Sequence, residues 1–209
     1  MALEGGFRES EQSWYEVLID LKSKGMLIPP ELAIGDGSLG FWKALSKVYD
    51  TTRWQRCWVH KTANVLNKLP KSLQAKAKEA LHQIWMAENK THATRKLDAF
   101  IRTYETKYPK AAACLEKERE VLLTFYDFPA EHWKHIRTTN PIESTFSTVR
   151  LRTAKVRSRF SSLTILTMAF QLCRCAQKRW IRLYHPERLA EVIRKVKFVD
   201  GIIEKRITA

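Results

Sequence analysis

Two acidic residues of the chain have neighbours that suit metal-dependent chemistry. Asp36 lies between two glycines, and Glu143 opens a segment that carries arginine and lysine but no other acid. A pair of carboxylates can bind Mg²⁺, which prefers oxygen ligands and can activate a nucleophile for attack on a phosphodiester. The cations that could then hold a phosphate backbone are Arg150, Arg152, Lys155, Arg157 and Arg159. Asp36 and Glu143 are therefore candidate metal ligands.

Each acid also has a purely structural explanation. The run from Asn140 to Glu143 predicts a helix start, with Asn140 as the N-cap and Pro141 at the first helical position. A glutamate three residues after an N-cap is a capping-box residue, which bonds back to the backbone of the cap. An aspartate between two glycines is a common turn residue. Spacing alone leaves both explanations open for Asp36 and for Glu143.

The sequence around Asp36 predicts a strand–helix–strand unit. Residues 32–34 form a short apolar strand, residues 38–49 a helix, and residues 53–60 a second strand rich in aromatic and β-branched residues. Strands joined through one helix lie parallel. Asp36 is then at the carboxyl end of a parallel strand, where open α/β sheets bind ligands, and His60 lies at the same edge.

The remaining sequence predicts helices. Apolar residues recur at helical spacing over residues 10–24, which end at Gly25, and over the block from 61 to 134, the segment 163–184 and the stretch after Pro186. In the helix that carries Glu143, the spacing of Ile142, Phe146 and Val149 predicts a buried stripe. The fold class is α/β but mostly α, with very few strands.

A zinc site is the alternative metal centre. Cys57 and His60 form a Cys-x-x-His pair, which Cys173 and Cys175 could complete. In a strand, however, residues three apart point to opposite faces, so the predicted strand over 53–60 speaks against shared ligation. Cys57 is then expected to be a buried core residue.

The composition indicates an anionic partner. The 209 residues carry a formal net charge of +15, and a basic balance of this kind is typical of nucleic-acid binding. Residues 131–209 hold 17 Lys and Arg against 6 Asp and Glu, whereas residues 1–130 hold 20 against 16, so the basic surface is C-terminal. No apolar run approaches the roughly 20 residues of a membrane helix. Irregularly spaced cysteines and no signal-like start predict a cytoplasmic protein without a membrane anchor.

Taken in chain order, these motifs resemble the Mutator-type transposases, in particular their bacterial insertion-sequence branch. The resemblance runs from about residue 9 to residue 195. It rests on Gly-Asp-Gly at residues 35–37, QRCWVHKTAN at 55–64, the helical block that follows, and TTNPIES at 138–144 with its basic continuation.

The resemblance implies a ribonuclease-H-like domain that uses two Asp and one Glu, the DDE triad, to bind Mg²⁺. By motif match Asp36 is the second acid and Glu143 the third, with Cys57, His60 and Asn140 as supporting residues. Residues 1–60 would be a partial core, residues 61–135 a helical insertion, and residues 136–209 the C-terminal helices. The implied partner is DNA, both the element ends and the target, and the full-length family is expected to self-associate.

One departure from the family pattern concerns the first acid. It should lie well upstream of Asp36, yet the only aspartate in residues 1–31 is Asp20, inside a predicted helix. We therefore expect the C-terminal half of a transposase that binds Mg²⁺ weakly or not at all and is inactive alone. The alternative is a non-catalytic, basic helical module for nucleic acid, in which Glu143 only caps a helix and Asp36 only makes a turn.

Overall fold

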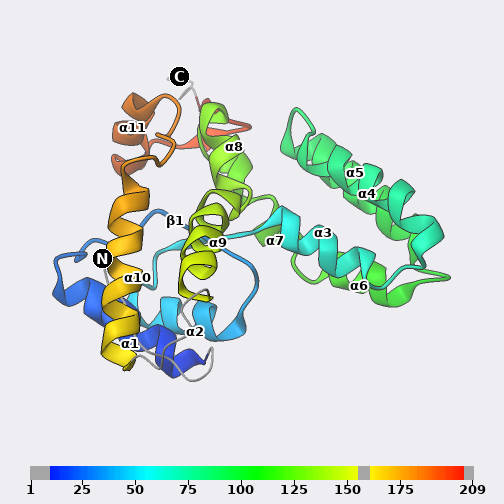
Figure 1. The fold of residues 1–209 in the computed structure, drawn as a ribbon. Coiled ribbons are helices and arrows are strands. Elements are labelled where there is room, and N and C mark those ends of the chain that lie inside the picture. The colour runs from blue at the N-terminus through cyan, green and yellow to red at the C-terminus, as the bar shows by residue number, and fades with distance from the viewer. Residues whose placement is uncertain (1–9, 155–160, 205–209) are drawn as a thin grey trace, which may run out of the picture. The chain divides into compact units, whose positions relative to one another are not determined.

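The computed structural model describes residues 10–154 and 161–204 (Figure 1). These residues divide into two compact units. The first contains residues 10–32, 37–52, 139–154 and 161–182, and the second contains residues 33–36, 53–138 and 183–204. Helices dominate both units, and strands are few and short, as the sequence predicts. Among the described residues, no helix has the length and apolar character needed to cross a bilayer.

The predicted strand–helix–strand unit is present. Strand β1 (Leu32–Gly35) pairs with β2 (Arg53–Arg56), and helix α2 (Leu39–Val48) lies between them in sequence. The backbone N–H of Cys57, directly after β2, donates to the carbonyl of Gly35 at 2.8 Å. Because each of these residues is at the carboxyl end of its strand, the two strands run parallel.

The prediction that the second strand extends to residue 60 is wrong. Strand β2 ends at Arg56, and helix α3 (Trp58–Leu66) begins two residues later. The physical reason lies in Trp58, which is fully buried and donates its indole N–H to the carbonyl of Leu122 at 2.8 Å. An aromatic, β-branched run resembles a strand locally, but here the large side chain of Trp58 packs among helices and selects the helix.

The predicted all-helical block from residue 61 to residue 134 is confirmed. Helix α3 packs against α4 and α6, and α5 also packs against α4 and α6, so the four helices close around one core (Figure 1). Core residues include Leu81, Leu97, Leu115 and Phe125, all fully buried. The elements after α3 are α4 (Lys71–Trp85), α5 (Lys90–Tyr104), α6 (Pro109–Glu116), α7 (Arg119–Leu122), the 3₁₀ helices η1 (Thr124–Asp127) and η2 (Ala130–His132), and α8 (Trp133–Ile136).

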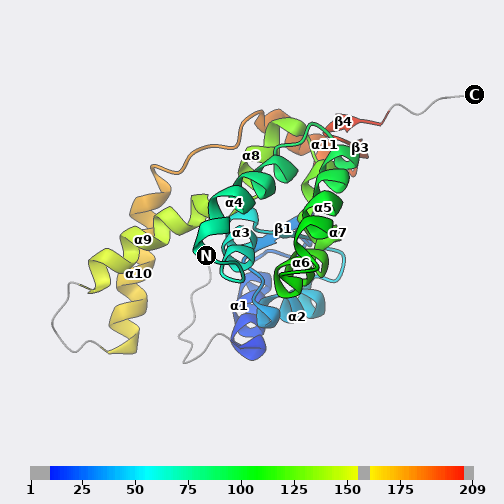
Figure 2. The ribbon, with the colours of Figure 1, turned by 90° about the vertical axis from the view of Figure 1, so that its right-hand side faces the viewer.

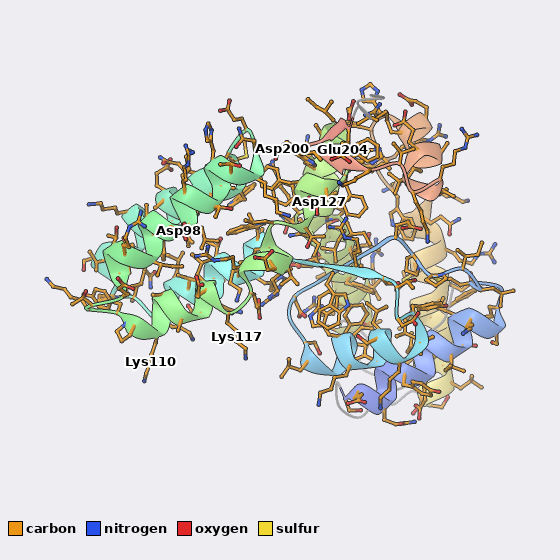
Figure 3. All side chains as sticks on the ribbon, turned by 180° about the vertical axis from the view of Figure 1, so that it is seen from behind. Asp98, Lys110, Lys117, Asp127, Asp200 and Glu204 are labelled. Atoms are coloured by element: carbon orange, nitrogen blue, oxygen red, sulfur yellow. The ribbon has the colours of Figure 1, made fainter. Side chains whose placement is uncertain are left out.

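A short hairpin that the sequence analysis missed closes the second unit. Strands β3 (Phe198–Val199) and β4 (Ile202–Ile203) pair in antiparallel fashion. The turn residue Asp200 accepts the backbone N–H of Lys90 at 2.6 Å, at the start of α5. Asp127 of η1 accepts the side chain of the same lysine at 3.3 Å, and Figure 3 labels both acids. The hairpin therefore fixes the N-terminus of α5.

The N-cap of α5 offers a stability test. The Asn89 side chain accepts the N–H of His92 at 2.8 Å. Replacing Asn89 by alanine should lower the free energy of unfolding by about 1 kcal/mol, because one helix-end donor loses its partner. Urea denaturation measures the change. Asn89→Ser retains a capping oxygen and should stay close to wild type; equal losses in the two variants would contradict a capping role.

The C-terminal helices are shorter than the sequence predicts. Helix α10 (Ser162–Gln177) stops well before residue 184. After Pro186 come a 3₁₀ turn, η3 (Pro186–Arg188), and a short helix, α11 (Leu189–Ile193), which ends before Lys195. Lys195 has a left-handed backbone (φ +58°), which cannot continue a right-handed helix.

In the first unit, α1 (Glu11–Ser23) packs against α2. The predicted stop at Gly25 is confirmed: its φ is +104°, and the N–H groups of Gly25 and Met26 bond back to the carbonyls of Lys22 and Leu21, each at 3.1 Å. This is a Schellman end, which needs a left-handed residue and therefore favours glycine.

Helices α9 (Asn140–Ala154) and α10 lie side by side (Figure 2). The indole N–H of Trp180 donates to the Thr145 hydroxyl of α9 at 3.1 Å. The expectation of a buried stripe on α9 is wrong, because Ile142 is 56% exposed and Phe146 46% exposed. Apolar spacing identified the helix but not how much of its surface is covered.

Candidate active site

Asp36 directly follows β1 and is exposed, whereas Gly35 before it is buried. The carbonyl of Gly35 accepts two hydrogen bonds, from the Cys57 N–H at 2.8 Å and from Nη1 of Arg56 at 3.3 Å. Gly37 has φ +101°, so the chain turns sharply after the acid in a conformation that favours glycine. The backbone on both sides of Asp36 therefore has a defined course, and the residue itself is exposed.

Glu143 lies in the first turn of α9 and is half-buried. The carbonyl of Thr139 accepts the N–H groups of Ile142 and Glu143 at 3.0 and 3.1 Å, and the Thr139 hydroxyl donates to the Glu143 carboxylate. Thr139 therefore occupies the capping position, and the prediction of Asn140 as the N-cap is wrong by one residue. Threonine is itself a good N-cap, and Pro141 at the second helical position still costs no hydrogen bond.

Arg137, two residues before Thr139, was not identified from the sequence. Its Nη1 donates to the carbonyl of Trp85 at 3.0 Å, and its guanidinium lies 4.6 Å from the centre of the Trp85 ring. Its own carbonyl accepts the N–H of Trp58 at 3.0 Å. Burial lowers the pKa of Arg137, but an arginine stays charged at neutral pH. The segment that leads into α9 is thus attached to the helical core.

Cys57 and His60 lie at the start of α3, with Cys57 at the N-cap position and buried and His60 half-buried. Residues three apart at a helix start share a side, so the argument from opposite strand faces is wrong. Nevertheless, in the described part of the chain no three His, Cys, Asp or Glu side chains gather into a group that could hold a metal ion. All four cysteines are free thiols. The zinc alternative therefore gains no support.

The basic run is only partly described. Arg150 and Arg152 are exposed on α9, while Lys155, Arg157 and Arg159 lie outside the described residues. At about 100° per residue, Arg150 shares the face of Glu143 two turns earlier, whereas Arg152 is on the opposite side. Only one of these two arginines can therefore accompany Glu143 on a single face.

The candidate residues fall in both units. Asp36, Cys57 and His60 belong to the second unit, and Asn140, Glu143, Arg150 and Arg152 belong to the first. The donor chemistry fits Mg²⁺, since both acids offer carboxylate oxygens and neither is fully buried. A carboxylate can supply part of a magnesium site, and further ligands are then required.

The sequence of most of this chain is similar to that of known proteins. Its residues 1–182 match the family model described as "Transposase, Mutator family". The chain is 56% identical over 197 residues to the transposase for insertion sequence element IST2 of Acidithiobacillus ferrooxidans, covering 94% of this chain and 67% of that protein. It is 47% identical over 208 residues to the transposase for insertion sequence element IS6120 of Mycolicibacterium smegmatis, covering 100% of this chain and 64% of that one. The chain thus spans about two thirds of the length of these relatives. With the family model matched over most of its length, the chain belongs to the Mutator family of transposases.

Proposed function

We propose that this chain supplies the second and third metal-binding acids, Asp36 and Glu143, of a DDE transposase with a ribonuclease-H-like core. The observation that carries the proposal is the position of Asp36: an exposed carboxylate at the carboxyl end of a parallel strand, directly after a carbonyl held by two donors. This is where α/β sheets bind ligands. Family membership supports the same assignment.

The proposed reaction is cleavage and transfer of DNA strands. Asp36 and Glu143 would hold Mg²⁺, which lowers the pKa of a bound water or hydroxyl and neutralises charge on the phosphate. The Thr139 hydroxyl, by donating to Glu143, orients that carboxylate. Arg150 and Arg152, with Lys155, Arg157 and Arg159, would hold the DNA phosphates. A third carboxylate must come from elsewhere, so the chain alone would be inactive.

A chimera tests this proposal. The part of the IST2 transposase outside the match, about a third of that protein, is joined to this chain, and cleavage of IST2 element ends is assayed with Mg²⁺. We expect the chimera to cleave and the chain alone not to. Asp36→Asn and Glu143→Gln should each lower the rate on the order of 10³-fold, because several kcal/mol of charge stabilisation are lost.

Glu131→Gln, in the 3₁₀ helix η2, is the matched control and should leave cleavage unchanged. If Asp36→Asn and Glu143→Gln cleave as well as this control, the two acids are not metal ligands. A chimera that binds DNA but never cleaves would instead favour the non-catalytic basic module.

The two exposed arginines of α9, Arg150 and Arg152, make a separate prediction about salt. The double variant Arg150→Gln/Arg152→Gln should bind arbitrary duplex DNA more weakly. Its plot of log affinity against log salt should be flatter by up to about 2, because each lost phosphate contact removes about 0.9 from the slope. Fluorescence anisotropy between low and moderate salt measures both quantities.

The control for this measurement carries the same charge change elsewhere. Lys110 lies in the first turn of α6 and Lys117 directly follows that helix. Both residues are exposed, and their side chains project outward (Figure 3). Lys110→Gln/Lys117→Gln should retain the wild-type slope. If both double variants had equally flattened slopes, overall charge rather than the arginines of α9 would determine binding. If both kept the wild-type slope, Arg150 and Arg152 would not contact phosphates.

A further inference from the structure

A buried cluster of charged side chains contacts the carboxyl end of β1, directly before Asp36. Arg56 and Lys61 are 4% and 3% exposed. One oxygen of Glu118, Oε2, is 2.7 Å from Nε of Arg56 and 2.7 Å from Nζ of Lys61. Burying two cations without a counter-charge would be very costly, so Glu118 is required where it is. Lys61 is further held by the Cys114 carbonyl, at 2.8 Å.

The Arg56 side chain contacts two parts of the second unit at once. While Nε donates to Glu118, Nη1 reaches the carbonyl of Gly35 at 3.3 Å. The guanidinium is planar and rigid, so fixing one edge on a carboxylate also fixes where the other edge points. Its second contact is with the last residue of β1, immediately before Asp36.

The helical core supplies the third member of this cluster. Glu118 lies between α6 and α7, 62 residues beyond Arg56. Stability alone does not demand such an arrangement, because well-packed apolar residues often serve a buried position equally well. What the charged cluster adds is a directed contact from the helical core to the end of β1.

We propose that Arg56 and Glu118 are positioning residues for Asp36: Glu118 holds the Arg56 guanidinium against the Gly35 carbonyl and thereby fixes the strand end that presents the acid. The inference rests on the proposed function in one respect only, namely that Asp36 is a metal ligand. It assigns the helical insertion a direct part in ordering the site.

The test uses the whole chain and two measurements by NMR. Arg56→Lys keeps the positive charge beside Glu118 but loses the planar fork, so the contact with Gly35 should be lost. Amide hydrogen exchange at Cys57, whose N–H donates to Gly35, should accelerate on the order of tenfold. In a Mn²⁺ titration, broadening of the Gly35 and Gly37 amides should need about tenfold more metal, in the range found for residues that orient a ligand.

Tyr126→Phe is the matched control. It removes another buried hydrogen bond of the same unit, to the Ala87 carbonyl at 2.8 Å, so any general loosening appears in both variants. In Tyr126→Phe, we expect the exchange rate of the Cys57 amide to be unchanged once any change in global stability is taken into account. The Mn²⁺ concentration that broadens the Gly35 and Gly37 amides should also be unchanged. If Arg56→Lys behaves like Tyr126→Phe in both measurements, Arg56 does not position Asp36.

Asp36→Asn separates this inference from the proposed function. If Mn²⁺ broadens the same amides equally in Asp36→Asn and in wild type, Asp36 is not a metal ligand and the proposed function fails. If Mn²⁺ broadens them in neither protein, the chain alone holds too few ligands for the metal, as its missing third acid leads us to expect. Cys57 exchange in Arg56→Lys then decides by itself whether Arg56 orders the strand end. If Asp36→Asn abolishes the broadening and Arg56→Lys leaves it unchanged, the proposed function stands and the positioning role fails.

Discussion

Replacing Trp58 by alanine is expected to lower the free energy of unfolding of the second unit by about 3–5 kcal/mol. Trp58 is fully buried, and its indole N–H donates to the Leu122 carbonyl at 2.8 Å. The substitution removes a large apolar side chain from the centre of the helical core and leaves a cavity that the neighbouring helices can fill only in part. Guanidinium denaturation followed by far-ultraviolet circular dichroism measures the loss.

Two further variants show which part of Trp58 matters. Trp58→Phe keeps most of the apolar volume, and the Leu122 carbonyl still accepts the Gln55 side chain at 3.1 Å, so this variant should lose much less stability. Val59, the next residue, is 40% exposed, and Val59→Ala should be nearly neutral. If Trp58→Ala were no worse than Val59→Ala, the helical core would not depend on this residue.

Helical periodicity predicted the elements well because it reports directly on which face of a helix is covered. It located α1 with its glycine end, α2, and the helical block from residue 61 onward. It failed at Trp58, where an aromatic, β-branched run is compatible with a strand and only tertiary packing selects the helix. It also failed on α9, since spacing shows that a stripe exists but not what covers it.

In the candidate site, too, one part could be predicted from the sequence and another could not. Asp36 was expected at the carboxyl end of a strand because Gly-Asp-Gly follows an apolar run, and it lies there. Arg56 and Glu118 could not have been paired from the sequence, because they are 62 residues apart and Glu118 has the local pattern of an ordinary surface residue. Local signals identify a residue that faces solvent at a turn. They do not identify the distant residues that hold its backbone.

Glu118→Gln should lower the free energy of unfolding at pH 7 by about 3 kcal/mol, because Arg56 and Lys61 would remain buried without a counter-charge. Removing one partner of a buried ion pair usually costs about 3–5 kcal/mol, and we expect the lower end because the Glu118 side chain is itself 29% exposed. Glu116→Gln is the matched control: its carboxylate pairs with Arg119 but is 51% exposed, so it should cost no more than about 1 kcal/mol.

The loss caused by Glu118→Gln should also depend on pH. Burial alone would raise the pKa of Glu118, but its hydrogen bond with Lys61 and the charges of Lys61 and Arg56 outweigh burial and lower that pKa. A lowered pKa in the folded protein means that the ionised carboxylate stabilises the fold above the ordinary glutamate value of about 4.3. This contribution is lost as the pH falls through that value toward the folded pKa. The gap between wild type and Glu118→Gln in urea denaturation should therefore be widest near pH 7 and narrow below about pH 4. A gap that stays constant down to pH 3 would show that the side chain's shape, rather than its charge, holds Arg56 in place.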